Sequence, residues 1–219
     1  MAASAGSLNW NTSWLKKESK VQNYCIMLLK SIILAACSLT AMPETKILVN
    51  TTQFTVVAKP EITVIKDLNA NTKSYIYFSL ATGKEVPAAD AKTKNWDIAF
   101  SKTTIATNSG TSGPGEGGAI VLEKPFDQVN EAPKDGYKTD GDAGFAIPGG
   151  SGNSWYKYDM SVHAILPIPG RTLLVKTANG KLAKVEIISY YKGAPEDVPT
   201  EESSYYTFRY TIAGEDGQF

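Results

Sequence analysis

The chain has 219 residues, of which 42% are hydrophobic and 20% are charged, a composition typical of a globular protein with a buried core. Its 22 basic and 22 acidic residues give a formal net charge of zero. This balance argues against a nucleic-acid partner, because nucleic-acid-binding domains usually carry a basic excess or a basic stripe. No apolar run approaches the about 20 residues that a transmembrane helix needs.

Both cysteines, Cys25 and Cys37, lie close to the N-terminus. A disulfide across the rest of the chain is therefore excluded. Zinc sites built from four cysteines, or from two cysteines and two histidines, are excluded as well, because His163 is the only histidine.

The N-terminal segment has the layout of a secretory signal. Lys16, Lys17 and Lys20 form a basic region, and the apolar run 26–36 follows, interrupted by Lys30. A buried helix with an incidental cysteine is the alternative interpretation. If residues 1–37 are removed, the remaining chain has a net charge of −3.

The signal-like segment ends in Leu34-Ala35-Ala36-Cys37, which resembles the bacterial lipobox, where a cysteine after small residues receives lipid. We therefore expect residues 1–37 to be a leader and lipoprotein signal, with Cys37 as the lipidated residue. The protein would then reach a membrane through its lipid anchor alone. Residues 38–59 are expected to form a tether and a first strand, and residues 60–219 a β domain.

Beyond Cys37 the apolar residues recur with period two, and β-branched and aromatic residues are frequent, as in half-buried strands. No stretch of ten residues has a clean helical period. We therefore expect an all-β fold, a single domain of antiparallel sheets with long Gly-rich loops at 107–118 and 141–153. The expected strands are 47–57, 62–65, 75–80, 95–101, 119–122, 155–162, 172–178, 182–190 and 205–212.

Three connections have specific expectations. Residues 66–73 are polar and predict a turn, and residues 86–94 have room for one helical turn. Asn179-Gly180, between two β-rich runs, predicts a hairpin with a type I′ turn, which needs positive φ at both central residues. The glycines of 107–118 could suggest a phosphate-binding loop, but no Gly-Lys-Ser/Thr leads into a helix there. We expect a bend in which glycine allows positive φ and close backbone approach.

Several short motifs are distinctive as a set. They are Asn95-Trp-Asp-Ile-Ala-Phe100, Asn108-Ser-Gly-Thr-Ser-Gly113, Gly117-Gly118-Ala119, Asp135-Gly136-Tyr137, Trp155, Asn179-Gly180-Lys-Leu-Ala-Lys-Val185 and Tyr206-Thr-Phe-Arg-Tyr210. Together they resemble one known family, the HmuY-like haem-binding lipoproteins, or haemophores, of Bacteroidetes bacteria. The resemblance extends over residues 60–212, and no single motif carries it alone.

The resemblance implies an all-β domain that is lipid-anchored at the outer membrane or secreted. Such a domain takes haem from host haemoproteins and passes it to a TonB-dependent outer-membrane receptor for iron acquisition. It catalyses no reaction. The family holds the iron between two axial side chains, a pair of His or a pair of Met, on two finger-like strands.

By this resemblance the second axial ligand lies five residues after Trp155, at Met160. A thioether ligates haem iron well. In a strand 155–162, Met160 would share a face with Tyr156 and Tyr158, whose rings could line a porphyrin. His163 would lie on the other face and is the alternative ligand if a bulge changes the register. The competing interpretation makes Met160 a core residue that fills a gap.

The first axial ligand is missing from its expected place. The interval 138–154 has no His, Met, Cys or Tyr, and the other methionine outside the signal, Met42, is close to the expected anchor. Ligation by Met160 or His163 alone, a tyrosinate from Tyr137, Tyr156 or Tyr158, and a ligand from a second protein all remain open. The fold could also persist without haem binding, in a surface lipoprotein for another ligand, glycan or protein.

Two other function classes would need different residues. A metal-free binding or adhesion module could use exposed aromatic side chains, with Tyr190, Tyr191, Tyr205 and Tyr206 as candidate platforms. An enzyme is not expected, because a Ser-His-Asp hydrolase would have to use His163 and no Gly-x-Ser-x-Gly motif is present. Neighbouring carboxylates are better explained as solvated loop charges; these are Glu123, Asp127, Glu201 and Glu202.

Overall fold

The computed structural model describes residues 60–219, which fall within one compact unit of the chain. The expected leader 1–37 with Cys37, the tether 38–59 and the strand 47–57 lie outside the described residues. In the part of the chain that is described, no helix is long and apolar enough to cross a membrane.

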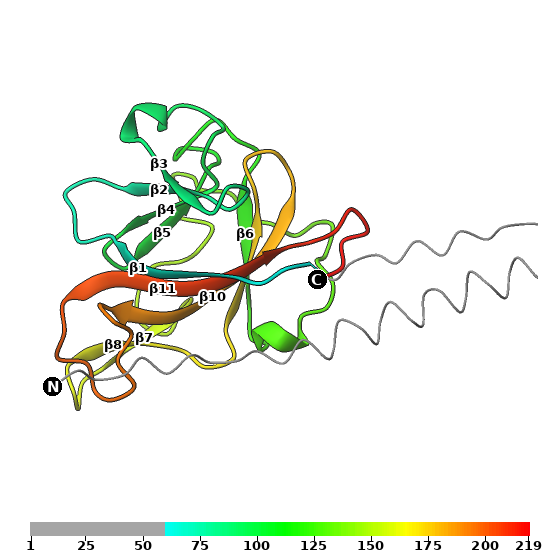
Figure 1. Cartoon of the computed structure of the whole chain (residues 1–219). Coiled ribbons are helices and arrows are strands. Elements are labelled where there is room, and N and C mark those ends of the chain that lie inside the picture. The colour runs from blue at the N-terminus through cyan, green and yellow to red at the C-terminus, as the bar shows by residue number, and fades with distance from the viewer. Residues whose placement is uncertain (1–59) are drawn as a thin grey trace, which may run out of the picture. The chain divides into compact units, whose positions relative to one another are not determined.

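Residues 60–219 form antiparallel β-sheets with two short 3₁₀ turns (Figure 1), which confirms the expected all-β class. One 3₁₀ turn, η1 (Ala88–Asp90), is the helical turn expected within 86–94. The other is η2 (Phe126–Gln128). The strands are β1 (Thr63–Asn69), β2 (Ile76–Ser79), β3 (Lys84–Val86), β4 (Ile98–Ser101), β5 (Thr104–Thr107), β6 (Gly118–Leu122), β7 (Tyr156–Asp159), β8 (Ala164–Pro167), β9 (Thr172–Lys176), β10 (Leu182–Tyr191) and β11 (Ser203–Ile212).

These strands form a five-stranded sheet in the order β1-β11-β10-β9-β6, a four-stranded sheet in the order β3-β2-β4-β5, and the two-stranded hairpin β7-β8. The four-stranded sheet lies on one side of the β1, β11 and β10 strands in Figure 1. The Gly-rich loop between β5 and β6 carries the chain from the smaller sheet to the larger one.

Aromatic side chains fill the space between the sheets. Phe78 of β2 and Phe208 of β11 meet edge to face with ring centroids 5.4 Å apart, and Phe100 of β4 lies 4.7 Å from Tyr206 of β11. Trp155, just before β7, lies 5.3 Å from Tyr206. Because rings from all three sheets share this one apolar cluster, the β7–β8 hairpin is anchored at its base by the main core.

Strand β1 is longer than the sequence predicts. Residues 66–69 were expected to turn, but they continue the strand through a bulge between Ile65 and Leu68. At the bulge Asp67 has φ +54° and its N–H donates to Thr207 Oγ1 at 3.3 Å. The bulge adds one residue to β1 and keeps Leu68 on the buried face. The polar residues around it predict a turn and do not indicate this bulge.

The β9–β10 hairpin is confirmed, but its expected type I′ turn is wrong. Gly180 has φ +82°, whereas Asn179 is not among the residues with positive φ. The Gly180 N–H donates to Thr177 O at 3.0 Å, which places Ala178 and Asn179 at the centre of the turn and Gly180 after it. This is the arrangement of a type I turn followed by glycine in a left-handed conformation.

Tertiary hydrogen bonds explain the extra residue in the loop of this hairpin. The N–H of Ala178 donates to Asp97 Oδ1 at 2.9 Å, and its carbonyl accepts from the Glu116 N–H at 3.0 Å. The other carboxylate oxygen of Asp97 accepts from the Leu80 N–H at 2.8 Å. Asp97 therefore joins the ends of β2 and β9, one from each of the two larger sheets.

Asn108 organises the Gly-rich loop in a similar way. Its amide nitrogen donates to Thr93 O at 2.9 Å and to Trp96 O at 2.7 Å, and its amide oxygen accepts from the Gly115 N–H at 2.9 Å. A Cβ on Gly113 would lie 2.2 Å from the same amide oxygen. The glycine is thus needed for close approach, as expected, and the loop is built around a fully hydrogen-bonded buried amide.

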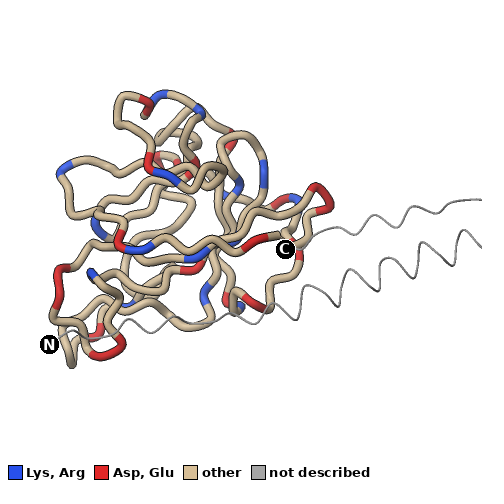
Figure 2. Tube along the Cα trace, viewed as in Figure 1, with Lys and Arg blue, Asp and Glu red and all other residues tan. Residues whose placement is uncertain are grey.

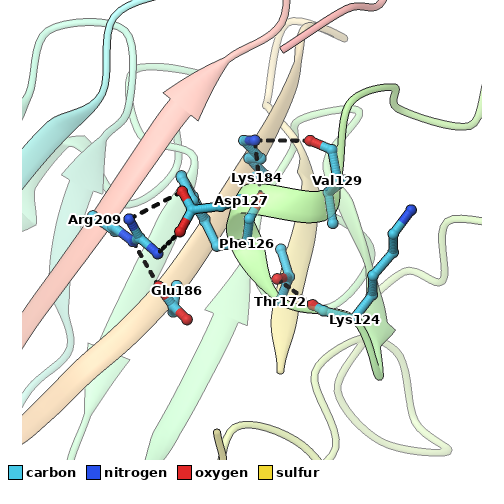
Figure 3. A network of polar contacts seen from close by, with 8 residues as sticks. All are labelled: Lys124, Phe126, Asp127, Val129, Thr172, Lys184, Glu186 and Arg209. Carbon is cyan, nitrogen blue, oxygen red and sulfur yellow. Dashed lines mark hydrogen bonds and ion pairs between the residues drawn. The ribbon is translucent and has the colours of Figure 1, made fainter. Parts of the chain in front are cut away.

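The segment around η2 is clamped onto the outer face of the five-stranded sheet (Figure 3). Arg209 of β11 contacts Glu186 of β10 (Nε to Oε2, 2.6 Å) and holds Asp127 with two hydrogen bonds. The buried Lys184 donates to Phe126 O at 3.0 Å and Val129 O at 2.8 Å.

Across the domain as a whole, basic and acidic residues are interspersed (Figure 2).

Candidate functional site

The β7–β8 hairpin carries Met160 and His163, and its local geometry differs from the expected strand 155–162. Strand β7 ends at Asp159, residues 160–163 form a turn, and β8 begins at Ala164. The Asp159 carboxylate accepts hydrogen bonds from Ser161 Oγ at 2.6 Å and from the Ser161 N–H at 3.0 Å. These two hydrogen bonds lower the pKa of Asp159 and fix the start of the turn.

His163 closes the turn with φ +53°, a left-handed conformation that is uncommon for residues other than glycine. Its Nδ1 lies 3.0 Å from the Tyr158 hydroxyl. The expectation that His163 points away from the face of Tyr158 is therefore wrong. The turn lets the chain reverse before His163, so the two side chains lie together and Nε2 is the ring nitrogen that this contact does not use.

Met160 lies at the tip of the hairpin with 73% of its surface exposed. The interpretation of Met160 as a gap-filling core residue is therefore wrong, because a core methionine would be covered by apolar neighbours. Two further apolar residues near the tip are exposed, Tyr158 (42%) and Val162 (37%). A thioether, an imidazole and a phenol ring are thus gathered at one solvent-facing turn.

The base of the hairpin is firmly held. Tyr156 is buried against Trp155, with ring centroids 4.7 Å apart, and the Trp155 indole N–H donates to Thr103 O at 3.2 Å. On the other strand, the Ile165 N–H donates to the Tyr191 hydroxyl at 2.9 Å. Tyr156 therefore belongs to the core that supports the site, while Tyr158 is the tyrosine next to the possible ligands.

The segment expected to carry an opposing finger is reduced to a tight turn. The backbones of Gly141 and Gly144 exchange two hydrogen bonds of 3.0 Å, so only two residues separate the paired glycines. The buried Asp140 fixes this turn by accepting from the Ala146 N–H at 2.8 Å and the Thr107 N–H at 2.9 Å. Phe145 follows the turn and is 39% exposed. No His, Met, Cys or Tyr is present in the interval 138–154.

Tyr137 lies apart from the hairpin. It packs against a second apolar cluster that contains Val129, Leu174 and Phe219. Its hydroxyl is buried without a hydrogen-bond partner, and burial raises the pKa of Tyr137 to about 12. A phenol in this environment strongly favours its protonated form, so we leave Tyr137 out of the candidate site.

The tyrosines expected as adhesion platforms are mostly part of the core. Tyr190, Tyr191 and Tyr206 are buried, and only Tyr205 is partly exposed, so the expectation of an exposed platform built from these residues is wrong. Strict alternation would place the consecutive Tyr190 and Tyr191 on opposite faces, but the pairing of β10 with β11 is irregular on either side of Ser189, and both rings are buried.

Three surface clefts, of about 480, 410 and 390 Å³, are lined by loops and strand ends away from the hairpin, and no residue of β7, β8 or their turn contributes to them. Residues 60–219 also bring together no group of three or more His, Cys, Asp or Glu side chains that could hold a metal ion. A ligand at Met160 would therefore bind on an open tip and be coordinated by one or two side chains.

The hairpin turn and the Tyr158–His163 contact were missed at the level of sequence. One signal was available: Asp159 followed by Ser161 is typical of a turn in which a side chain binds the next backbone N–H groups, and apolar alternation resumes at Ala164. The exposed Phe145 and Val162 were not singled out by any motif.

Comparison with protein families finds a match to the HmuY protein family over residues 71–210, which is more than half of the chain. Among solved structures, the apo HmuY analog TFO of Tannerella forsythia is 17% identical with a TM-score of 0.45, and covers 71% of this chain and 96% of its own. Apo PinO, from Porphyromonas gingivitis, is 17% identical with a TM-score of 0.49, and covers 72% of this chain and 99% of its own. Comparison with curated proteins finds no match.

Proposed function

Since the chain belongs to the HmuY family, whose members are associated with haem binding, we propose that it is a non-catalytic haem-binding protein with Met160 as the axial ligand of the iron. The observation that carries this proposal is the exposure of Met160, 73%, at a turn whose base is anchored in the core. A rigidly supported, solvent-facing thioether can approach an iron centre without unfolding any part of the domain.

The donor set at the tip fits haem on one of its faces. The Met160 sulfur is a soft ligand, and the exposed ring of Tyr158 offers a flat surface for porphyrin stacking. His163 is the alternative ligand through Nε2, since Nδ1 contacts Tyr158. Haem would supply the iron and its two axial positions, while the chain supplies one ligand and an apolar contact.

We further propose the cellular setting that this role implies. Cys37 would carry the lipid, which places the protein at the outer membrane or, after release, outside the cell. Haem would come from host haemoproteins and pass to a TonB-dependent outer-membrane receptor, as the family resemblance implies. The proposed role is binding and delivery, which requires no catalytic side chains at the site.

A spectral titration of the full chain with haemin, oxidised and then reduced, tests the proposal. We expect a shift of the Soret band that Met160→Leu removes, because leucine keeps the apolar bulk and lacks the sulfur lone pair. His163→Gly is the matched control, since glycine suits the positive φ and leaves Met160 in place. The absence of a Soret shift in both redox states would reject haem binding, and loss of the shift only in His163→Gly would assign the ligand to His163.

A further inference from the structure

We propose that two copies of the chain clamp one haem, each copy giving Met160 to one face of the porphyrin. The inference rests on the proposed haem binding and adds the partner, which is a second copy of this chain. The family resemblance places the first axial ligand in the interval 138–154. In this chain that interval contains the tight Gly141–Gly144 turn, closed by two backbone hydrogen bonds, and offers no such ligand, so the second copy would fill this axial position.

The first argument is coordination geometry. The two axial ligands of haem approach from opposite faces of the porphyrin, so side chains from one tight turn reach only the same face. Met160 and His163 are three positions apart in the turn between β7 and β8 and therefore compete for one axial position. Among residues 60–219, Met160 is the only methionine, and His163 is the only histidine of the whole chain. A second thioether or imidazole for the opposite face is therefore not available within residues 60–219, and a second copy of the chain would supply it.

The second argument is exposure at the tip. Met160 stands out with 73% of its surface exposed, and Tyr158 and Val162 are exposed beside it. The exposure of these three side chains means that a porphyrin placed against them would have its other face open to solvent. A second hairpin tip, approaching from that face, would cover both the porphyrin and these apolar side chains.

The third argument is charge. Lys157 and Asp159 lie on the same strand, their charged groups are 4.0 Å apart, and Lys157 is 53% exposed. A two-fold axis through the iron would bring the same surface of each copy together. If one residue of the first copy contacts a second residue on the other copy, the reverse contact is then also made. Lys157 of one copy can then face Asp159 of the second copy, and the reverse contact follows by symmetry. In such a dimer the charges of the two tips would be complementary, and each tip would supply one axial ligand.

Sedimentation of the full chain at increasing haemin concentration measures the stoichiometry. We expect a haemin-dependent dimer with about one haemin for every two chains. Met160→Leu should weaken haemin-dependent dimerisation by about tenfold or more, whereas Val198→Ala, at an exposed apolar residue outside the hairpin, should leave it unchanged. Haemin bound at one per chain with no change in sedimentation overturns the shared haem but leaves haem binding intact. Failure of haemin to bind at all rejects the proposed function itself.

A mixing experiment tests the shared iron directly. Met160→His places an imidazole at the same exposed tip position, so this variant alone and the unmodified chain alone should give different haem spectra. If two chains share one iron, an equal mixture contains a mixed imidazole–thioether species whose spectrum is not the sum of the two. A spectrum equal to that sum shows that each iron is held by a single chain and contradicts the proposal.

Discussion

Asp97 is a buried carboxylate that stabilises the fold by joining the ends of β2 and β9. Its two oxygens accept the Leu80 and Ala178 N–H groups at 2.8 and 2.9 Å, and burial raises the pKa of Asp97 although these hydrogen bonds act to lower it. Asp97→Ala leaves both N–H groups without an acceptor in the interior. We expect a loss of about 3 kcal/mol in the free energy of unfolding, measured by urea denaturation.

Asp97→Asn provides the matched comparison. An amide has one acceptor oxygen, so one of the two N–H groups keeps its partner, and the expected loss is about half that of Asp97→Ala. Equal stability of Asp97→Ala and the unmodified chain would show that water replaces the carboxylate and that Asp97 does not join the sheets.

The motif residues illustrate what the sequence can and cannot reveal. Asn95-Trp-Asp and the loop that begins at Asn108 indicated the family correctly, yet Trp96, Asp97 and Asn108 are buried and hydrogen-bonded within the fold. Such motifs identify a scaffold because buried polar groups tolerate few substitutions. They say nothing about the ligand, which we propose to bind at the exposed tip.

At the scale of elements, the sequence predicts most strands but few of their ends. The alternation of apolar residues in 182–190 and 205–212 corresponds to β10 and β11. The same rule joins β7 and most of the following turn into one expected strand, 155–162, because the tip residues are apolar as well, and it misses β8. A turn that exposes Met160 and Val162 looks like a strand unless the side chain of Asp159 is taken into account.

One hydrogen bond ties β8 of the hairpin to β10 of the five-stranded sheet. The Ile165 N–H of β8 donates to the Tyr191 hydroxyl of β10 at 2.9 Å. Tyr191→Phe removes the acceptor and should speed hydrogen exchange of the Ile165 amide by about tenfold, the equivalent of about 1.4 kcal/mol for local opening. Tyr205→Phe, at a partly exposed ring of the next strand, is the control. Unchanged exchange at Ile165 in Tyr191→Phe would show that the hairpin is held by its base alone.

At the scale of the whole molecule, tyrosine burial links stability to alkaline pH. Burial raises the pKa of Tyr75, Tyr190, Tyr206 and Tyr210, and raises that of Tyr137 to about 12. In the unfolded chain these phenols ionise near pH 10. Above that pH the unfolded state therefore releases protons that the folded state retains, and stability falls as the pH rises, by at most about 1.4 kcal/mol per pH unit for each such tyrosine.

Tyr137 allows this linkage to be tested at one site. Its hydroxyl is buried without a hydrogen-bond partner, so Tyr137→Phe should leave stability at pH 7 unchanged or slightly higher. Between pH 10 and pH 12 the variant should lose stability less steeply than the unmodified chain, in urea titrations repeated across that range. Tyr206→Phe is the contrast, because the Tyr206 hydroxyl donates to Lys102 O at 2.6 Å and its loss should already destabilise the fold at pH 7. If Tyr137→Phe shows the same alkaline slope as the unmodified chain, its phenol ionises in the folded state as readily as in the unfolded one, and the buried environment assigned to it is incorrect.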